Sequence, residues 1–179
     1  MDTVTIKDKT FAISIPSERL EEAVQFVADK MNRDLRDKDP LFLCVLNGAF
    51  IFASDLLKKV QMACQISFVK LASYQGTETT ETVKTLIGLN DDLKGRTVVV
   101  VEDIVDTGIT MEHVVARLKD AGAAEVKIAT LFFKPDSFRR DYAIDYVGMS
   151  IPNDFIVGYG LDYDGYGRNL PHVYSLIAD

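Results

Sequence analysis

Hydrophobic and polar residues alternate with two different periods along the chain, and this predicts both strands and helices. Residues 3–15 alternate loosely, which is typical of one or two short strands near the edge of a sheet. Residues 15–35 have helical spacing, with Ser17 as the expected N-cap. The apolar stripe of this helix is expected at Leu20, Val24, Val27 and Met31.

Short apolar runs between polar turns predict the remaining elements. Buried or alternating strands are expected in the segments 40–46, 65–74, 85–89, 98–101, 126–134 and 146–152. Helices are expected at 49–60 and 110–121, the second of which ends just before Gly122. The polar segment 75–84 is interpreted as a solvated loop, and residues 155–177 as glycine-rich loops that close the chain.

Strands that alternate with helices predict an α/β fold. Several strands are apolar on both faces, which indicates a central, mostly parallel sheet flanked by helices. The 179 residues fit one domain, in which roughly 70% of the unfolded surface can be buried. In such a sheet the ligand is expected beyond the carboxyl ends of the strands.

Composition and charge exclude several classes of protein. The chain is 47% hydrophobic and 26% charged, which is ordinary for a globular domain. Its net charge of −7 argues against a general nucleic-acid binder, which would need a basic surface. No window approaches 18 apolar residues and the first residues carry no targeting signal. We therefore expect no membrane partner and a cytoplasmic location.

Carboxylates crowd against the end of the most apolar strand. The run Val98–Val101 is followed by Glu102, Asp103 and Asp106, so three carboxylates occur within five residues. Like charges repel and resist burial, so this arrangement does not serve stability. The alternative interpretation is that Glu102 and Asp103 are solvated charges at a strand end and that an ordinary turn follows.

The next residues predict an anion site. The turn after Asp106 leads into the helix expected from Thr110, whose N-terminus presents free N–H groups and a positive dipole end. Gly108 lets the backbone approach a ligand, and Thr107 adds a hydroxyl. A phosphorylated sugar would use both the carboxylates and this cradle, and a divalent metal would suit the same carboxylates.

The stretch 98–110 resembles the phosphoribosyl-pyrophosphate (PRPP) binding signature of type I phosphoribosyltransferases. Four further segments resemble the hypoxanthine-guanine branch of that family: a pyrophosphate loop at 45–50, a flexible loop at 71–79, a purine-contacting strand end at 132–136, and a base and metal segment at 154–173. The resemblance implies a single domain over 1–179, with a core at about 38–150 and a small hood formed by about 1–15 and 151–179.

The resemblance also implies a reaction. A 6-oxopurine, hypoxanthine or guanine, would react with PRPP and Mg²⁺ to give IMP or GMP plus pyrophosphate. Two alternatives remain open at this point. One is a regulator of the same fold that senses PRPP or nucleotides and binds nucleic acid, and the other is a phosphoribosyltransferase that prefers xanthine.

The family's roles fall on particular residues of this chain. Asp106 is implied as the acid or base at purine N7, while Glu102 and Asp103 accept hydrogen bonds from the ribose hydroxyls. The 5′-phosphate would be held by the backbone from Asp106 onward, through Thr107, Gly108, Ile109 and Thr110. Pyrophosphate would meet Leu46, Asn47, Gly48 and Arg168, and the family often has a cis peptide bond at the first two. The purine would meet Lys134, Phe155, Ile156 and Asp162.

Metal, loop and assembly follow from the same resemblance. Mg²⁺ is implied at Asp162 together with Glu102 and Asp103. Ser73 and Tyr74 begin the implied flexible loop, and a homo-oligomer, dimer or tetramer, is implied. Two positions depart from many relatives, which carry a lysine where this chain has Asn47 or Ile109.

Overall fold

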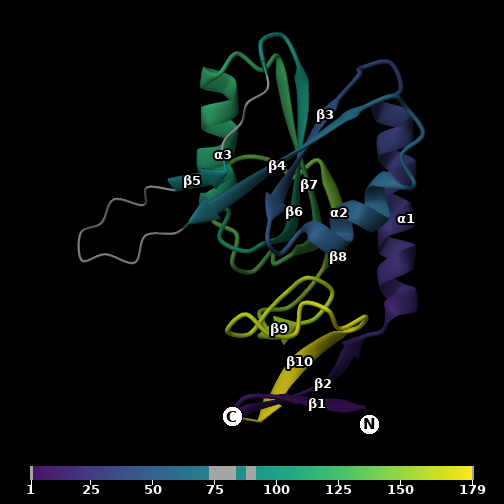
Figure 1. Ribbon diagram of the computed structural model, residues 1–179, viewed down its shortest axis with the longest axis vertical. Coiled ribbons are helices and arrows are strands. Elements are labelled where there is room, and N and C mark those ends of the chain that lie inside the picture. The colour runs from purple at the N-terminus through teal and green to yellow at the C-terminus, as the bar shows by residue number, and fades with distance from the viewer. Residues whose placement is uncertain (1, 73–83, 88–91, 179) are drawn as a thin grey trace.

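A six-stranded sheet forms the centre of the molecule. The computed structural model describes residues 2–72, 84–87 and 92–178, and Figure 1 shows this sheet in its upper part. The strand order is β5-β4-β3-β6-β7-β8. These strands are β3 (Leu41–Leu46), β4 (Gln65–Ala72), β5 (Lys84–Ile87), β6 (Thr97–Val105), β7 (Glu125–Phe133) and β8 (Tyr146–Ser150). All neighbouring pairs are parallel except β4 and β5, so the predicted α/β fold with a mostly parallel sheet is confirmed.

The valine run occupies the centre of this sheet. β6 pairs with β3 on one side and β7 on the other, and Val98 to Val101 have no exposed surface. Successive side chains of a strand point to opposite faces. Val99 and Val101 accordingly belong to one hydrophobic cluster, and Val98 and Val100 to the other. The run is apolar throughout because both faces of β6 are covered.

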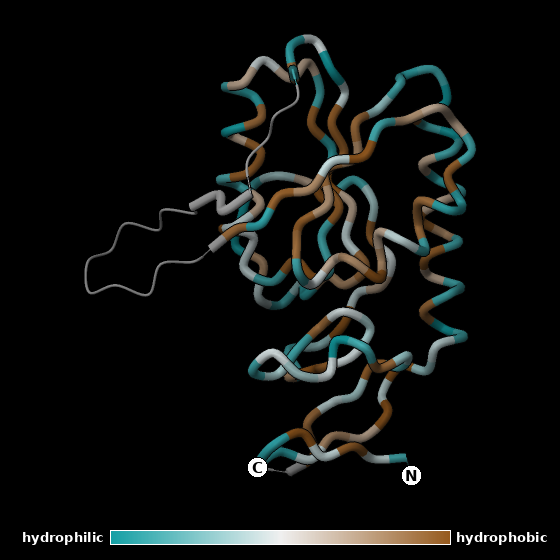
Figure 2. Tube along the Cα trace, viewed as in Figure 1, coloured by the Kyte–Doolittle hydropathy of each residue, from teal (hydrophilic) through white to brown (hydrophobic). Residues whose placement is uncertain are grey.

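Three helices cover the two faces. Helices α1 (Ser17–Asp34) and α2 (Phe50–Leu57) pack on the face of Val99 and Val101, and α3 (Ile109–Asp120) packs on the opposite face. Figure 2 shows the hydrophobic residues gathered in the strands between these helices. Among the described residues no helix is long and apolar enough to cross a membrane.

The two ends of the chain form a second sheet, which is the hood of the predicted fold. Its strands are β1 (Thr3–Ile6), β2 (Lys9–Ile15), β9 (Ile156–Val157) and β10 (Val173–Ala178), in the antiparallel order β1-β2-β10-β9. Figure 1 shows it below the larger sheet. The prediction of loops alone over 155–177 is wrong for β9 and β10. Register shifts interrupt the pairing of β10 with β2, so its side chains do not alternate regularly.

The start of α1 and the end of β6 are among the boundaries that differ from the sequence prediction. α1 starts at Ser17 itself, with Pro16 at the N-cap and no side-chain cap; instead the Ser17 N–H donates to His172 Nδ1 of the hood at 2.9 Å. A cap supplied by a residue 155 positions away has no local sequence signal. β6 extends to Val105, so Glu102 and Asp103 lie within the strand rather than beyond it, because β7 continues beside them.

Candidate active site

A tight turn connects β6 to α3. Gly108 has φ 86°, and a Cβ at this position would lie 2.5 Å from a ring carbon of Phe138 and 2.9 Å from the Tyr142 hydroxyl. Tyr142 also donates to the Gly108 carbonyl. Only glycine fits here, both by conformation and by space. The aromatic side chains therefore pack against the turn. The first N–H groups of α3 have no partner within the helix, and that of Ile109 makes a long contact of 3.5 Å with Thr107 Oγ1.

A small pocket opens at this turn. Its volume is about 160 Å³, and its lining includes most of the predicted PRPP residues. These are Glu102, Asp103, Asp106, Thr107, Gly108 and Thr110. Ile109 begins α3 but does not line the pocket. Carboxylates thus line the same pocket as the N-terminus of α3, whose positive dipole end favours an anion.

Glu102 and Asp103 form a crowded acidic pair. Glu102 is only 8% exposed, and its carboxylate accepts the Asp103 N–H at 3.0 Å. Burial, and then the neighbouring Asp103 carboxylate, raise the pKa of Glu102 well above its usual value. Asp103 in turn accepts the Ile104 N–H at 2.8 Å. A bound cation, or hydroxyl groups that donate to both residues, would relieve the repulsion between these two carboxylates.

The loop after β3 lies against this acidic pair. A Cβ at Gly48 would fall 1.8 Å from Asp103 Oδ2, and a Cβ at Gly160 would fall 2.2 Å from the Gly48 carbonyl oxygen. Gly48 is therefore enclosed between the end of β6 and a turn of the hood. The Leu46–Asn47 peptide bond just before it is cis, as the family resemblance implied. Three segments that are distant in sequence meet at Gly48.

Lys134 joins Asp106 to the hood. Its Nζ lies 3.6 Å from Asp106 Oδ2 and donates to the Asp154 carbonyl at 3.1 Å. The Lys134 side chain is 11% exposed, whereas that of Asp106 is 50% exposed. The ammonium is thus held in position by two acceptors, and the carboxylate next to it remains accessible. A ligand that presents both an acceptor and a titratable nitrogen would fit this pair.

The predicted purine residues of the hood follow directly after Asp154. Phe155 is 45% exposed, and its ring packs against Phe11 at 6.1 Å and edge-on against Tyr163 at 5.8 Å. Ile156 is buried and pairs with Ser175 in the hood sheet. The structure brings Lys134 and the start of this segment together, and it holds the Phe155 ring against other aromatic rings.

Asp162 and Arg168 form a separate pair in the hood. Asp162 binds Arg168 Nη2 at 2.8 Å and accepts the Gly165 N–H at 2.7 Å. Arg168 also donates through Nη1 to the Gly160 carbonyl at 2.7 Å. The structure does not gather Asp162 into one cluster with Glu102 and Asp103; within the described ranges, no three His, Cys, Asp or Glu residues could jointly hold a metal. A single metal site formed by all three carboxylates is therefore not present in this arrangement.

Some residues that contact the site are not predicted by the sequence, and one predicted segment falls outside the described residues. Tyr142, Gly160 and the Asp154 carbonyl all contact predicted residues, yet none of them was singled out. The glycine-tyrosine-glycine run at 158–160 was the available signal for a close backbone approach. Ser73 and Tyr74, the predicted flexible loop, lie outside the described residues.

Comparisons with known proteins agree with this geometry. Residues 16–164 match the family described as the phosphoribosyl transferase domain. The hypoxanthine-guanine phosphoribosyltransferase of Streptococcus thermophilus (strain CNRZ 1066) is 41% identical over 148 residues, which is 82% of each chain.

Solved structures give the same result. A hypoxanthine-guanine phosphoribosyltransferase from Bacillus anthracis superimposes with a TM-score of 0.86 at 35% identity, covering 93% of this chain and 97% of that one. A hypoxanthine phosphoribosyltransferase from Staphylococcus aureus has a TM-score of 0.87 at 31% identity, covering 93% and 91%. The chain belongs to the phosphoribosyltransferase family, in its hypoxanthine-guanine branch.

Proposed function

We propose that this protein is a purine salvage enzyme. It transfers the 5-phosphoribosyl group from PRPP to hypoxanthine or guanine and releases IMP or GMP plus pyrophosphate. The observation that carries this proposal is the meeting of Asp106, Lys134 and the Asp154 carbonyl beside the phosphate turn. One carboxylate, one ammonium and one anion cradle are the groups that such a transfer requires.

The ribose phosphate is proposed to bind in the 160 Å³ pocket. Its 5′-phosphate would accept from the N–H groups at the start of α3 and from the hydroxyls of Thr107 and Thr110. Glu102 and Asp103 would accept from the ribose hydroxyls. Their negative charge would also stabilise the cationic character that C1′ develops as pyrophosphate leaves.

The purine is proposed to lie between Lys134 and the hood. Lys134 would donate to the 6-oxo group, and the accessible face of Phe155 would stack on the ring. The backbone of Ile156 and the turn at Asp162 would border the 2-position. Asp106 would exchange a proton with N7, a step worth roughly 10²–10⁴-fold in rate.

Pyrophosphate and Mg²⁺ complete the proposed site. The loop formed by Leu46, Asn47 and Gly48 would contact pyrophosphate on one side. Arg168 would contact it on the other side. Mg²⁺, when bound, would neutralise part of the charge of the leaving pyrophosphate. The Glu102–Asp103 pair suits a cation, because its crowded charge raises the pKa of Glu102. Asp162 would bind the metal only if its ion pair with Arg168 opened.

We also propose a cytoplasmic location and no nucleic-acid partner. The proposed substrates are small, and PRPP is too highly charged to cross a membrane unaided. The net charge of −7 disfavours nucleic acid. Fractionation of cells that express the protein would test the location, and recovery with the membrane fraction would contradict it.

The function is tested by offering PRPP and Mg²⁺ with hypoxanthine, guanine, xanthine and adenine in parallel. Hypoxanthine or guanine should give nucleotide, whereas adenine should not, because its amino group would face the Lys134 ammonium donor to donor. Lys134→Ala should reduce kcat/KM for hypoxanthine at least tenfold. The ratio of kcat/KM for hypoxanthine to that for adenine should therefore decrease. If wild type binds PRPP tightly but no base reacts, the protein is instead a sensor.

A second variant isolates the proton-transfer step. Asp106→Asn keeps the shape of the side chain but removes its basic oxygen, so kcat should fall by about 10²–10⁴-fold. PRPP affinity, measured by calorimetry, should change little, because the phosphate turn is held by Gly108, Phe138 and Tyr142. A large loss of PRPP affinity with near-normal turnover would contradict the role of Asp106.

The buried acid should destabilise the protein at neutral pH. Since folding raises the pKa of Glu102, its neutral form is the favoured one, and stability is lost as pH rises from the ordinary glutamate value through the raised value. Glu102→Gln is always neutral and can still accept the Asp103 N–H. In metal-free buffer at pH 7, the free energy of unfolding of this variant should exceed that of wild type by about 1 kcal/mol. The difference should shrink near pH 4, and an equal difference at both pH values would contradict this account.

We propose that the protein is a homo-oligomer. Ile66 and Phe68 of β4 are 48% and 46% exposed, and they pair in register with Phe42 and Cys44 on the helix-covered face of β3. A second copy would cover this apolar edge. Analytical ultracentrifugation should therefore give a mass in solution that is a multiple of 19.9 kDa. Phe68→Glu should lower this mass, because it weakens the contact between copies. Phe26→Glu, on the exposed side of α1, is the matched control and should leave the mass unchanged.

A further inference from the structure

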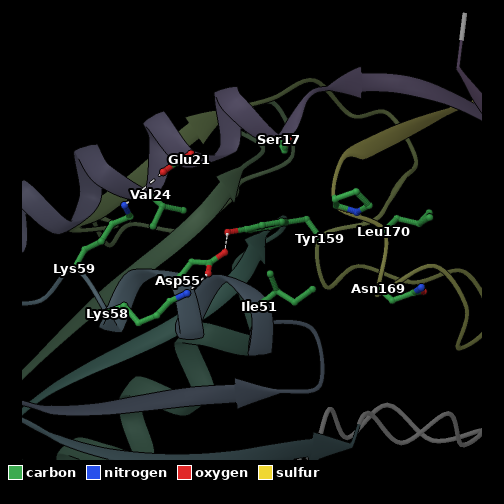
Figure 3. A pocket seen from close by; sticks show the side chains of 11 residues that line it. Ser17, Glu21, Val24, Ile51, Asp55, Lys58, Lys59, Tyr159, Asn169 and Leu170 are labelled. Atoms are coloured by element: carbon green, nitrogen blue, oxygen red, sulfur yellow. Dashed lines mark hydrogen bonds and ion pairs between the residues drawn. The ribbon is translucent and has the colours of Figure 1, made fainter.

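A second pocket lies apart from the phosphate pocket. It measures about 750 Å³ and lies between α1, α2 and the hood. Figure 3 shows its lining, with the Tyr159 side chain reaching across to Asp55 on α2. The two pockets share no lining residue. The contact between Tyr159 and Asp55 therefore connects the hood to the core along a different path from Lys134.

The hydrogen bond across this pocket is well defined. Tyr159 Oη donates to Asp55 Oδ2 at 2.6 Å, and Lys58 Nζ lies 2.9 Å from Asp55 Oδ1. Burial raises the pKa of the Asp55 carboxyl, but hydrogen bonds from Tyr159 and Lys58 outweigh this and leave it below its usual value. Burial, and then the contact with Asp55, raise the pKa of Tyr159. At neutral pH the pair is a phenol that donates to a carboxylate.

The backbone at Tyr159 indicates that its side chain is required. Tyr159 has φ 50°, in the left-handed region that favours glycine, and it stands between Gly158 and Gly160. Such a conformation is unfavourable for a non-glycine residue. The Tyr159 side chain is nevertheless 8% exposed and packs in the core cluster of α1 and α2. The strained turn thus places the ring of Tyr159 in the core and its hydroxyl at Asp55.

Both ends of the hydrogen bond are tied to the pyrophosphate side of the site. Gly160, the next residue after Tyr159, approaches the Gly48 carbonyl and accepts from Arg168. Asp55 lies on α2, which begins two residues after Gly48. The contacts thus form a closed ring, which runs from Gly48 through α2 to Asp55, across to Tyr159, and back through Gly160.

We propose that Tyr159 and Asp55 are positioning residues that set Gly160 and Arg168 against Gly48 and so shape the pyrophosphate end of the PRPP site. Neither residue lines the phosphate pocket, and among the hydrogen bonds and ion pairs of the described residues neither contacts Lys134 or Asp106. Their loss should therefore affect PRPP and pyrophosphate more than the purine. This inference rests on the proposed phosphoribosyl transfer and adds two residues to it.

The test compares Tyr159→Phe and Asp55→Ala with wild type in steady-state kinetics. Each variant should raise the KM for PRPP about tenfold, since a hydrogen bond to a charged group is lost, and should change the KM for hypoxanthine by less than about twofold. The double variant should be no worse than Asp55→Ala alone, because both substitutions remove one shared contact. Asp55→Asn keeps an oxygen that can accept from Tyr159, so it should stay closer to wild type.

Lys58→Ala is the matched control. Lys58 contacts the same carboxylate, but its side chain is 71% exposed, so its removal should change the KM for PRPP by less than about twofold. Equal increases in both KM values, additive effects in the double variant, or an unchanged KM for PRPP would overturn the proposal. If Tyr159→Phe does not fold, the contrast between Asp55→Asn and Asp55→Ala decides. Absence of turnover by wild type would instead overturn the proposed function.

Discussion

The close approach at Gly48 is the constraint on which the rest of the site depends. Asp103 Oδ2 lies where a Cβ of residue 48 would be, and the Gly48 carbonyl lies where a Cβ of Gly160 would be. A backbone without side chains is the only way to bring three segments this close. The result places an acidic pair, a loop of exposed backbone groups and the hood turn that binds Arg168 in one cluster.

Charge repulsion in this cluster is tolerated because a ligand would relieve it. Glu102 is buried beside Asp103, and neither residue has a cationic partner among the ion pairs of the described residues. The central strand that carries them is fixed by β3 and β7 on either side, so the carboxylates cannot move apart. The burial of the valines in the same strand offsets the free energy of unfolding that the crowded carboxylates cost. The apolar start of β6 is therefore part of the core, and its polar end carries the groups proposed to bind the ribose.

The sequence predicted those parts of the molecule that leave a local signature. Val98 to Val101, the turn at Gly108 and the helix after it all follow from periodicity, glycine and apolar burial. The wrong predictions concern long-range partners. The Ser17 N–H donates to His172 rather than being capped by its own side chain, and β10 is a strand that pairs with the distant β2 and with β9. The Tyr159–Asp55 contact spans 104 residues, so no spacing rule could indicate it. Roles for Lys134 and Arg168 came from family resemblance, since a lone cation has no pattern of its own.

The hood is attached to the core by packed apolar side chains and by chemically specific hydrogen bonds, some of which lie at the site. Lys134 binds the Asp154 carbonyl beside the proposed purine, Tyr159 binds Asp55 beside the proposed pyrophosphate, and Ser17 binds His172 at the start of α1. Both ends of the chain form the hood, and β2, which ends at Ile15, leads directly into α1, which begins at Ser17. These contacts add to that short connection in setting the position of the hood. A transfer reaction needs the base from one side and the activated sugar from the other, in register. The contacts that hold the two sheets together therefore also determine the distance between the two proposed substrates.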